Sequence, residues 1–267
     1  MILARLLTHP LTRGLDLDSP ATTVRRRQVV RDKPFLRRIY REWYTSLAAA
    51  VPAGEGDVLE LGSGPGFLQE YIPGLITSDI MPLPGVLRVV DARRIDCAPA
   101  SLRGIVMTNV LHHLPDVSQF FAEASRCVRP GGVIAMVEPW LSPWSRIIYR
   151  WLHHEPFVPD TIAWEFPGDG PLSDANGALP WIVFQRDRAR FQRDFPGWAI
   201  RSITPCMPFR YLLSGGVSMR SFVPAFTYGF WKTCEAWLKP WINFWAMFAV
   251  IVLERVALQV EKSKACA

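Results

Sequence analysis

The segment VLELGSGPGF at residues 58–67 constrains the fold more than any other part of the chain. Its first four residues, Val58 to Leu61, predict a short buried strand, because all but one are apolar. Three glycines with the spacing GxGxG follow at once and predict a tight turn that opens a helix, because residues without a Cβ take positive φ and let a ligand approach the backbone. This pattern is typical of a cofactor-binding loop, although the loop alone also fits a structural turn.

Strand-like apolar runs recur along the chain, with helical or loop segments between them. They lie at residues 57–61, 74–79, 86–90, 104–109 and 133–138, and two more follow near 198–203 and 248–253. Such alternation predicts a parallel sheet with helices on both faces. The expected fold class is therefore α/β, with a doubly wound Rossmann-like sheet.

The last of these runs, PWINFWAMFAVIVL, has fourteen residues without a charge. A helix that spans a membrane needs about 20 apolar residues. Lys239, Glu254 and Arg255 bound the run too closely for that length. A helix end at Trp241 to Trp245, followed by a buried strand, is the better prediction.

Positive charge is concentrated at the N-terminus. Residues 1–44 hold ten Lys or Arg and four Asp or Glu, an excess that equals the net +6 of the whole chain. Apolar residues are interleaved among the basic ones between Arg25 and Arg41, so residues 1–46 predict a basic helical arm that is broken or kinked near Pro34. The arm fits a surface that meets anionic lipid or a phosphorylated substrate, and it also fits a solvated helix beside the core.

The cysteines and the N-terminal segment add limits on the compartment. Five scattered cysteines without a CxxC pair indicate neither a zinc site nor a disulfide framework, so a reducing, cytoplasmic compartment is expected. The opening residues lack the long apolar region and cleavage site of a signal peptide.

Polar residues stand where the predicted strands end, which is where open α/β sheets bind their ligands. Asp79 ends the second run, and an acidic side chain there can accept both hydroxyls of a ribose, although a surface Asp is the plainer alternative. Asp91 and Ala92 follow the third run. The fourth run leads into NVLHHLPD at residues 109–116, and the helix after it is expected to stop at VRPGG, at Pro130 and Gly131.

In this order and spacing, Glu60, LGSGPG, Asp79, Asp91, NVLHHLPD and VRPGG resemble the class I S-adenosylmethionine-dependent methyltransferases, in particular the type 11 group. The resemblance covers residues 51–138. It implies a seven-stranded, mostly parallel sheet with an antiparallel last strand, and S-adenosylmethionine as the cofactor. A departure is the short segment FLQEYIPG after the glycine loop, where Pro73 leaves room for only two helical turns.

The resemblance also assigns positions to a cofactor site. Glu60 and the backbone of the glycine loop would hold the methionine portion, and Asp79 would bind the ribose. Asp91, Ala92 and Ile80 would border the adenine, while Asn109 and Val110 would lie below the sulfonium. The implied cofactor-binding residues are Glu60, Gly62, Ser63, Gly64, Gly66, Asp79, Ile80, Asp91, Ala92, Asn109 and Val110.

Two histidine pairs, at 112–113 and 153–154, are candidates for proton transfer, because an imidazole has a pKa near neutrality. His112 or His154 is the candidate general base if the acceptor is a hydroxyl, and a purely structural role for one His of each pair is the alternative. No metal site is expected, because apart from Glu155 no carboxylate stands at an obvious ligand spacing from the two histidine pairs.

Beyond residue 140 the chain adds two aromatic-rich insertions to the expected core of residues 47–140. Residues 141–190 predict a Trp-lined lid that selects the acceptor, and residues 191–260 complete the core, with a hydrophobic insertion at about 206–241 before a tail at 261–267. The aromatic residues of the second insertion fit a core or an exposed interfacial surface.

Three functions are consistent with these features. The first is a methyltransferase for a bulky, apolar or lipid-linked small molecule that is approached at the cytosolic face of an anionic membrane. The second is a soluble O- or N-methyltransferase of an aromatic or sugar metabolite. The third is a regulatory module that binds the nucleoside without turnover. Nucleic acid is not expected as a partner, because no recognition domain follows the core; the oligomeric state is left open.

Overall fold

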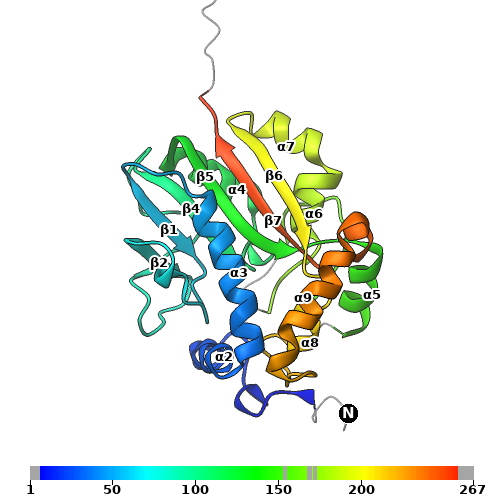
Figure 1. The fold of residues 1–267 in the computed structure, drawn as a ribbon. Helices are drawn as coiled ribbons and strands as arrows, with labels where there is room; N and C mark the ends of the chain where they lie inside the picture. Colours follow the sequence, from blue (N-terminus) through cyan, green and yellow to red (C-terminus); the bar gives the residue numbers. More distant parts are fainter. Residues whose placement is uncertain (1–6, 153–154, 167–169, 171–172, 258–267) are drawn as a thin grey trace, which may run out of the picture.

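A seven-stranded sheet forms the centre of the computed structural model, which describes residues 7–152, 155–166, 170 and 173–257 (Figure 1). The strand order is β3-β2-β1-β4-β5-β7-β6. All neighbouring pairs are parallel except the two made by β7, which is antiparallel to both β5 and β6. The predicted Rossmann-like sheet with an antiparallel last strand is thus confirmed. The strands are β1 Asp57–Leu61, β2 Leu75–Asp79, β3 Arg88–Val89, β4 Leu102–Thr108, β5 Val128–Pro139, β6 Trp198–Cys206 and β7 Phe248–Arg255.

Helices cover both faces of the sheet, because neighbouring residues of each strand point to opposite sides. One face packs on α4 (Val117–Cys127), α6 (Leu179–Trp181) and α7 (Arg188–Asp194), with Leu59 and Ile105 among the sheet residues in that cluster. The opposite face, with Val58 and Val106, packs on α3 (Pro34–Ala50). Both clusters consist of fully or nearly fully buried side chains, so the sheet lies between two apolar layers.

The basic arm folds as two helices, and the predicted break near Pro34 is confirmed. Helix α2 spans Pro20–Asp32, and α3 begins at Pro34. Proline is favoured at the first position of a helix, where its missing N–H has no intrahelical partner. Each helix buries part of its surface, so the arm is not merely solvated. The buried apolar residues are Val29, Val30, Phe35, Leu36, Ile39, Tyr40, Trp43, Tyr44 and Leu47.

Two local predictions are wrong. The two-turn helix expected after the glycine loop is a single 3₁₀ turn, η2 (Leu68–Glu70), because the chain turns away at Pro73 and at Gly74, which has φ +72°. The stop signal expected at Pro130 and Gly131 is also misplaced. Helix α4 already ends at Cys127, and the VRPGG segment lies within the long strand β5.

The helical elements described in the first insertion are α5 (Pro143–Leu152), α6, the π-helical segment η4 (Ile182–Arg186) and α7. Two of its four tryptophans differ in burial. Trp164 is 1% exposed and donates through Nε1 to Asp187 at 2.9 Å, whereas Trp151 is 73% exposed. The insertion therefore contributes to the core at one side and to the surface at the other.

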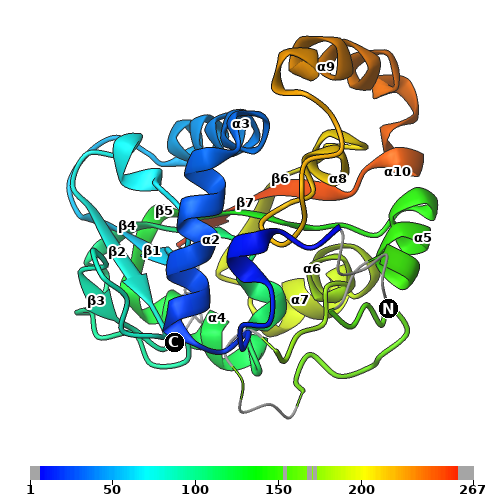
Figure 2. The same cartoon turned by 90° about the horizontal axis from the view of Figure 1, so that it is seen from below.

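The second insertion holds short helices that extend away from the sheet (Figure 2). They are α8 (Arg210–Ser214), η5 (Ala225–Thr227), α9 (Tyr228–Trp237), η6 (Lys239–Trp241) and α10 (Ile242–Trp245). The predicted helix end followed by a buried strand is confirmed, since α10 leads directly into β7. Within the described residues, no helix combines the length and the apolar character needed to cross a membrane. Two further 3₁₀ turns are η1 (Pro10–Thr12) and η3 (Leu111–His113).

Candidate functional site

A cavity of about 360 Å³ opens at the carboxyl ends of β1, β2 and β4. This volume is in the range of sites that bind small molecules and cofactors. The structure brings together here every predicted site residue that it describes: Glu60, Gly62, Ser63, Gly64, Gly66, Asp79, Ile80, Asp91, Ala92, Asn109, Val110 and His112. The remaining candidate, His154, lies outside the described residues.

The glycine loop is held in a conformation that requires its glycines. Gly62 has φ +67°, and a Cβ at this position would lie 2.4 Å from Cγ2 of Val110. A Cβ on Gly66 would lie 2.3 Å from the Tyr44 hydroxyl, which belongs to α3. The backbone N–H of Ser63 donates to the Ser78 carbonyl at 2.8 Å and ties the loop to β2. The backbone of the loop thus packs closely against Val110 and Tyr44 at the edge of the cavity.

Two buried carboxylates flank this loop. Glu60 accepts a hydrogen bond from the Ser63 hydroxyl at 2.5 Å. Burial raises the pKa of Glu60 to about 7, although the bond from Ser63 opposes the shift. Asp79 accepts backbone N–H groups from Gly64 at 3.0 Å and Met81 at 3.1 Å, and burial raises the pKa of Asp79 despite these bonds. Both carboxylates are fixed in position beside the glycine turn.

The rim of the cavity is more exposed. Asp91 pairs with Arg93 at 2.8 Å, and the hydrogen bond from Arg93 lowers the pKa of Asp91. Ala92 is buried behind it, whereas the side chain of Ile80 is 45% exposed. The exposed apolar side chain of Ile80 at the mouth of the cavity is suited to pack against a flat ring.

Beyond the glycine loop, β4 leads into the short turn η3. Asn109 has φ +58°, and its Oδ1 atom is buried without a hydrogen-bond partner among the described residues, as is Oγ1 of Thr108. Buried polar atoms are normally paired. Both residues line the cavity, so a ligand there could supply the missing hydrogen bonds.

The η3 turn is fixed by Glu138 at the end of β5. One oxygen of Glu138 accepts the N–H groups of Val110 and Leu111, each at 2.8 Å, and the other lies 2.6 Å from Nδ1 of His112. Burial would lower the pKa of His112, but the Glu138 and Glu155 carboxylates outweigh it and raise the pKa to about 9. For the adjacent His113, burial and the His112 charge lower the pKa to about 4.

Several cavity residues were not predicted from the sequence. Helix α2 contributes Thr23 and Arg26. The neighbouring Arg27 donates to the carbonyls of Gly64 at 2.9 Å and Pro84 at 2.6 Å. The basic, partly apolar arm was the only signal that could have placed α2 here. Other lining residues outside the prediction include Tyr40, Tyr44, Tyr149, Glu155, Tyr211 and Phe248.

Comparison with known proteins agrees with this geometry. Residues 59–136 match the family model described as Methyltransferase domain. Geranyl diphosphate C-methyltransferase from Streptomyces coelicolor A3(2), solved with Mg²⁺, geranyl diphosphate and S-adenosyl-L-homocysteine, has a similar fold at 12% identity, with a TM-score of 0.51 over 94% of this chain and 89% of that one. A chain of the complex between the Haloferax volcanii Trm112 methyltransferase activator and a methyltransferase aligns at 13% identity, with a TM-score of 0.50 over 91% of this chain and 100% of that one. Among curated proteins, no sequence matches.

The matched segment is a methyltransferase domain, and the sheet has the fold of the class I S-adenosylmethionine-dependent methyltransferases. The residues present fit S-adenosylmethionine. Gly62 and Gly64 line the cavity with positive φ, and so does Asn109, whose buried Oδ1 has no hydrogen-bond partner among the described residues. The acidic lining by Glu60, Asp79 and Asp91 complements a ligand that carries both a sulfonium and an ammonium group.

Proposed function

We propose that this methyltransferase acts on a bulky, apolar or lipid-linked small molecule, which it meets at the cytosolic surface of an anionic membrane. The observation that carries the proposal is an exposed apolar surface on α5, η5, α9, η6 and α10, here called the aromatic surface. Its members are Trp151, Phe226, Phe230, Trp237, Trp241 and Phe244, each at least half exposed. Large exposed apolar surfaces on a protein mark sites that meet a membrane, a partner or a ligand.

The second insertion connects this surface with the cavity. Tyr211 of α8 and Phe248 at the start of β7 line the cavity, and α8 packs against α9, which carries Phe230 and Trp237 outward. An apolar acceptor held at the aromatic surface would therefore have only the thickness of this insertion between it and the cofactor site. The fold shared with the geranyl diphosphate enzyme is compatible with such an acceptor.

Basic residues border the aromatic surface. Lys232 and Lys239 lie on α9 and η6, and Arg146 and Arg150 lie on α5 beside Trp151. Lysine and arginine next to apolar side chains favour binding to anionic lipid by about 1 kcal/mol per basic residue near the surface. Together, these features support peripheral membrane contact.

In the proposed site, S-adenosylmethionine supplies an electrophilic methyl group when it is bound. Glu60, Asp79 and the glycine loop would hold and orient the cofactor. Alignment with the acceptor in a cavity from which water is displaced accounts for most of the rate enhancement expected in such a transfer. A proton-accepting role for His112 stays a prediction that applies if the acceptor is a hydroxyl.

A flotation assay with vesicles of phosphatidylcholine and phosphatidylserine tests the membrane contact. The full-length protein should float with these vesicles at low salt, and a Phe230→Ser/Trp237→Ser/Trp241→Ser variant should not. Ile162→Ser is the matched control, because Ile162 is 85% exposed but lies outside the aromatic surface. Wild-type protein that stays at the bottom of the gradient, or a triple variant that floats equally well, would contradict the proposal.

The cofactor site is tested by calorimetric titration with S-adenosylmethionine. Removing a carboxylate that makes charge-assisted hydrogen bonds costs about 1.5–3 kcal/mol, so Asp79→Ala should weaken binding by roughly 10- to 150-fold. Asp96→Ala, at an exposed position, should bind as the wild type does. Equal affinity in Asp79→Ala and wild type would exclude Asp79 from the cofactor site.

A soluble methyltransferase for a ring-shaped metabolite is the second candidate. The aromatic side chains of Tyr149, Phe166 and Tyr211 line the cavity and favour a flat acceptor. A screen with labelled methyl groups, applied separately to membrane and soluble extracts, distinguishes the two candidates by the fraction in which the labelled product appears.

A further inference from the structure

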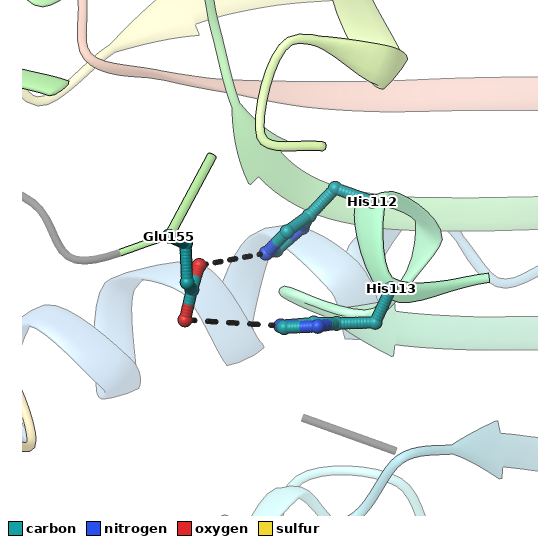
Figure 3. Close-up of side chains that lie close together, drawn as sticks. All are labelled: His112, His113 and Glu155. Carbon is teal, nitrogen blue, oxygen red and sulfur yellow. Dashed lines mark ion pairs between the residues drawn. The ribbon is translucent and has the colours of Figure 1, made fainter. Parts of the chain in front are cut away.

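His112, His113 and Glu155 converge inside the cavity, although they come from separate parts of the chain (Figure 3). The η3 turn presents both imidazoles, and the Glu155 carboxylate lies against them. Nε2 of His112 lies 3.5 Å from one oxygen of Glu155, and Nε2 of His113 lies 4.0 Å from the other. Each of the three residues offers one possible ligand atom, and these three atoms all lie within 4.8 Å of one another.

The second nitrogen of each ring faces an oxygen atom. Nδ1 of His112 lies 2.6 Å from Glu138, and Nδ1 of His113 lies 3.2 Å from the backbone carbonyl of Asp174. Histidines that bind metals almost always donate the other ring N–H to a carboxylate or carbonyl, which fixes the tautomer and aims the lone pair at the ion. Both rings have this arrangement, and both direct Nε2 toward Glu155.

We propose that His112, His113 and Glu155 form a binding site for a divalent first-row transition metal ion, with Glu138 as the residue that orients His112. Two imidazoles and one carboxylate are the protein ligands of many catalytic zinc and non-haem iron sites. The imidazoles favour such ions over Mg²⁺ or Ca²⁺, which prefer oxygen ligands.

The spacing is close to what an ion requires. Ligands about 2.1 Å from a tetrahedral ion lie roughly 3.4 Å apart. Glu155 lies 3.5 Å from Nε2 of His112 and 4.0 Å from Nε2 of His113, and the three ligand atoms lie within 4.8 Å of one another, so small side-chain movements would bring them into range. Catalytic metal sites with three protein ligands leave further coordination positions of the ion open, and here these positions would face the cavity.

The metal site would lie in the same cavity as the cofactor. Asn109 and Val110, which are predicted to lie below the sulfonium, directly precede the η3 turn. That an ion here would contact the methyl acceptor rests on the proposed function, whereas metal binding itself does not.

Titration of chelator-treated protein with Co²⁺ tests the site, because the visible absorption of Co²⁺ reports its coordination. We expect one equivalent of Co²⁺ per chain, with the spectrum of a low-coordinate nitrogen and oxygen site, and displacement by Zn²⁺. His113→Ala and Glu155→Gln should each weaken Co²⁺ binding by at least about 10-fold, and Glu138→Gln by about 10- to 100-fold. His9→Ala, at a histidine on the far N-terminal segment, should not change it.

Calorimetric titration with S-adenosylmethionine shows that each variant is folded and separates this proposal from the proposed function. Co²⁺ binding that is absent, or unchanged in His113→Ala and Glu155→Gln variants that still bind S-adenosylmethionine, would overturn the metal site. Stoichiometric Co²⁺ binding that depends on these residues supports it, whether or not a lipid-linked acceptor is found.

Discussion

Glu60 is a buried carboxylate whose ionisation links stability to pH. Burial raises its pKa from 4.5 to about 7, so between these values the folded protein holds a proton on Glu60 that the unfolded chain has released. The contribution of Glu60 to the free energy of unfolding is therefore greatest below pH 4.5. It falls by about 3 kcal/mol in total as the pH rises to about 7. Because the predicted site holds the ammonium group of S-adenosylmethionine near Glu60, the ligand should lower this pKa and reduce the loss.

Urea unfolding at several pH values measures this effect. The free energy of unfolding of Glu60→Gln minus that of wild type should increase between pH 5 and pH 7.5. The amide of the variant stays neutral in this range, whereas the Glu60 carboxyl of the wild type ionises. Glu70→Gln, at an exposed position, should show no such trend. Parallel curves for Glu60→Gln and wild type would mean that Glu60 is ionised throughout this range.

At the scale of elements, the glycine loop depends on α3 as well as on its own sequence. The Tyr44 hydroxyl lies against Gly66 and accepts the Phe67 N–H at 3.4 Å. Gly66→Ala should therefore push the two elements apart, weaken S-adenosylmethionine binding and destabilise the fold by about 1–3 kcal/mol. Adding Tyr44→Phe removes the atom that lies 2.3 Å from the new methyl group, and the ring carbon behind it is 3.5 Å away.

The double variant should thus regain part of the stability and of the affinity that Gly66→Ala loses. Thermal unfolding and calorimetry on wild type, both single variants and the double variant give the coupling energy. Purely additive effects would show that Tyr44 does not limit the space at Gly66, and would leave the Ser63 carbonyl, 3.0 Å from the methyl position, as the cause.

The sequence predicted elements whose pattern is local. The strands β1, β2, β4 and β5 are apolar runs at the predicted places. Asp79 ends β2, as predicted, and lines the cavity. The helix after the glycine loop was wrongly predicted, since the single turn η2 takes its place before the chain turns at Pro73 and Gly74. Phe67, which precedes η2, packs against Tyr44 of the distant helix α3, with ring centroids 4.9 Å apart.

Contacts between distant segments were the other part that the sequence did not show. Glu138 was predicted only as the end of a strand, yet it fixes His112 and the η3 turn. Glu155 reaches the cavity from the first insertion, and Arg27 of the arm reaches the carbonyl of Gly64 in the glycine loop. Such positions follow from tertiary packing, which single-sequence periodicity does not encode.

For the whole molecule, a cluster of charges attaches the second insertion to the arm. Arg210 of α8 pairs with Glu235 of α9 at 2.6 Å and with Glu42 of α3 at 3.0 Å, and it donates to the Tyr228 hydroxyl at 2.7 Å. Arg210 and Glu235 are each 7% exposed in their side chains. The aromatic surface is therefore carried by an insertion whose position depends on buried charges.

Arg210→Met should lower the free energy of unfolding by about 3–5 kcal/mol, because it leaves Glu235 buried without its partner. Lys232→Met removes a cation that is 58% exposed and pairs with Glu42 at 2.6 Å, so it should cost less than about 1 kcal/mol. Urea unfolding measures both values. In the double variant Arg210→Met/Glu235→Gln, the buried charge is also removed, and stability should partly return. A loss in Arg210→Met no larger than in Lys232→Met would mean that water or another cation neutralises Glu235, and that the insertion is held by its apolar contacts with α3.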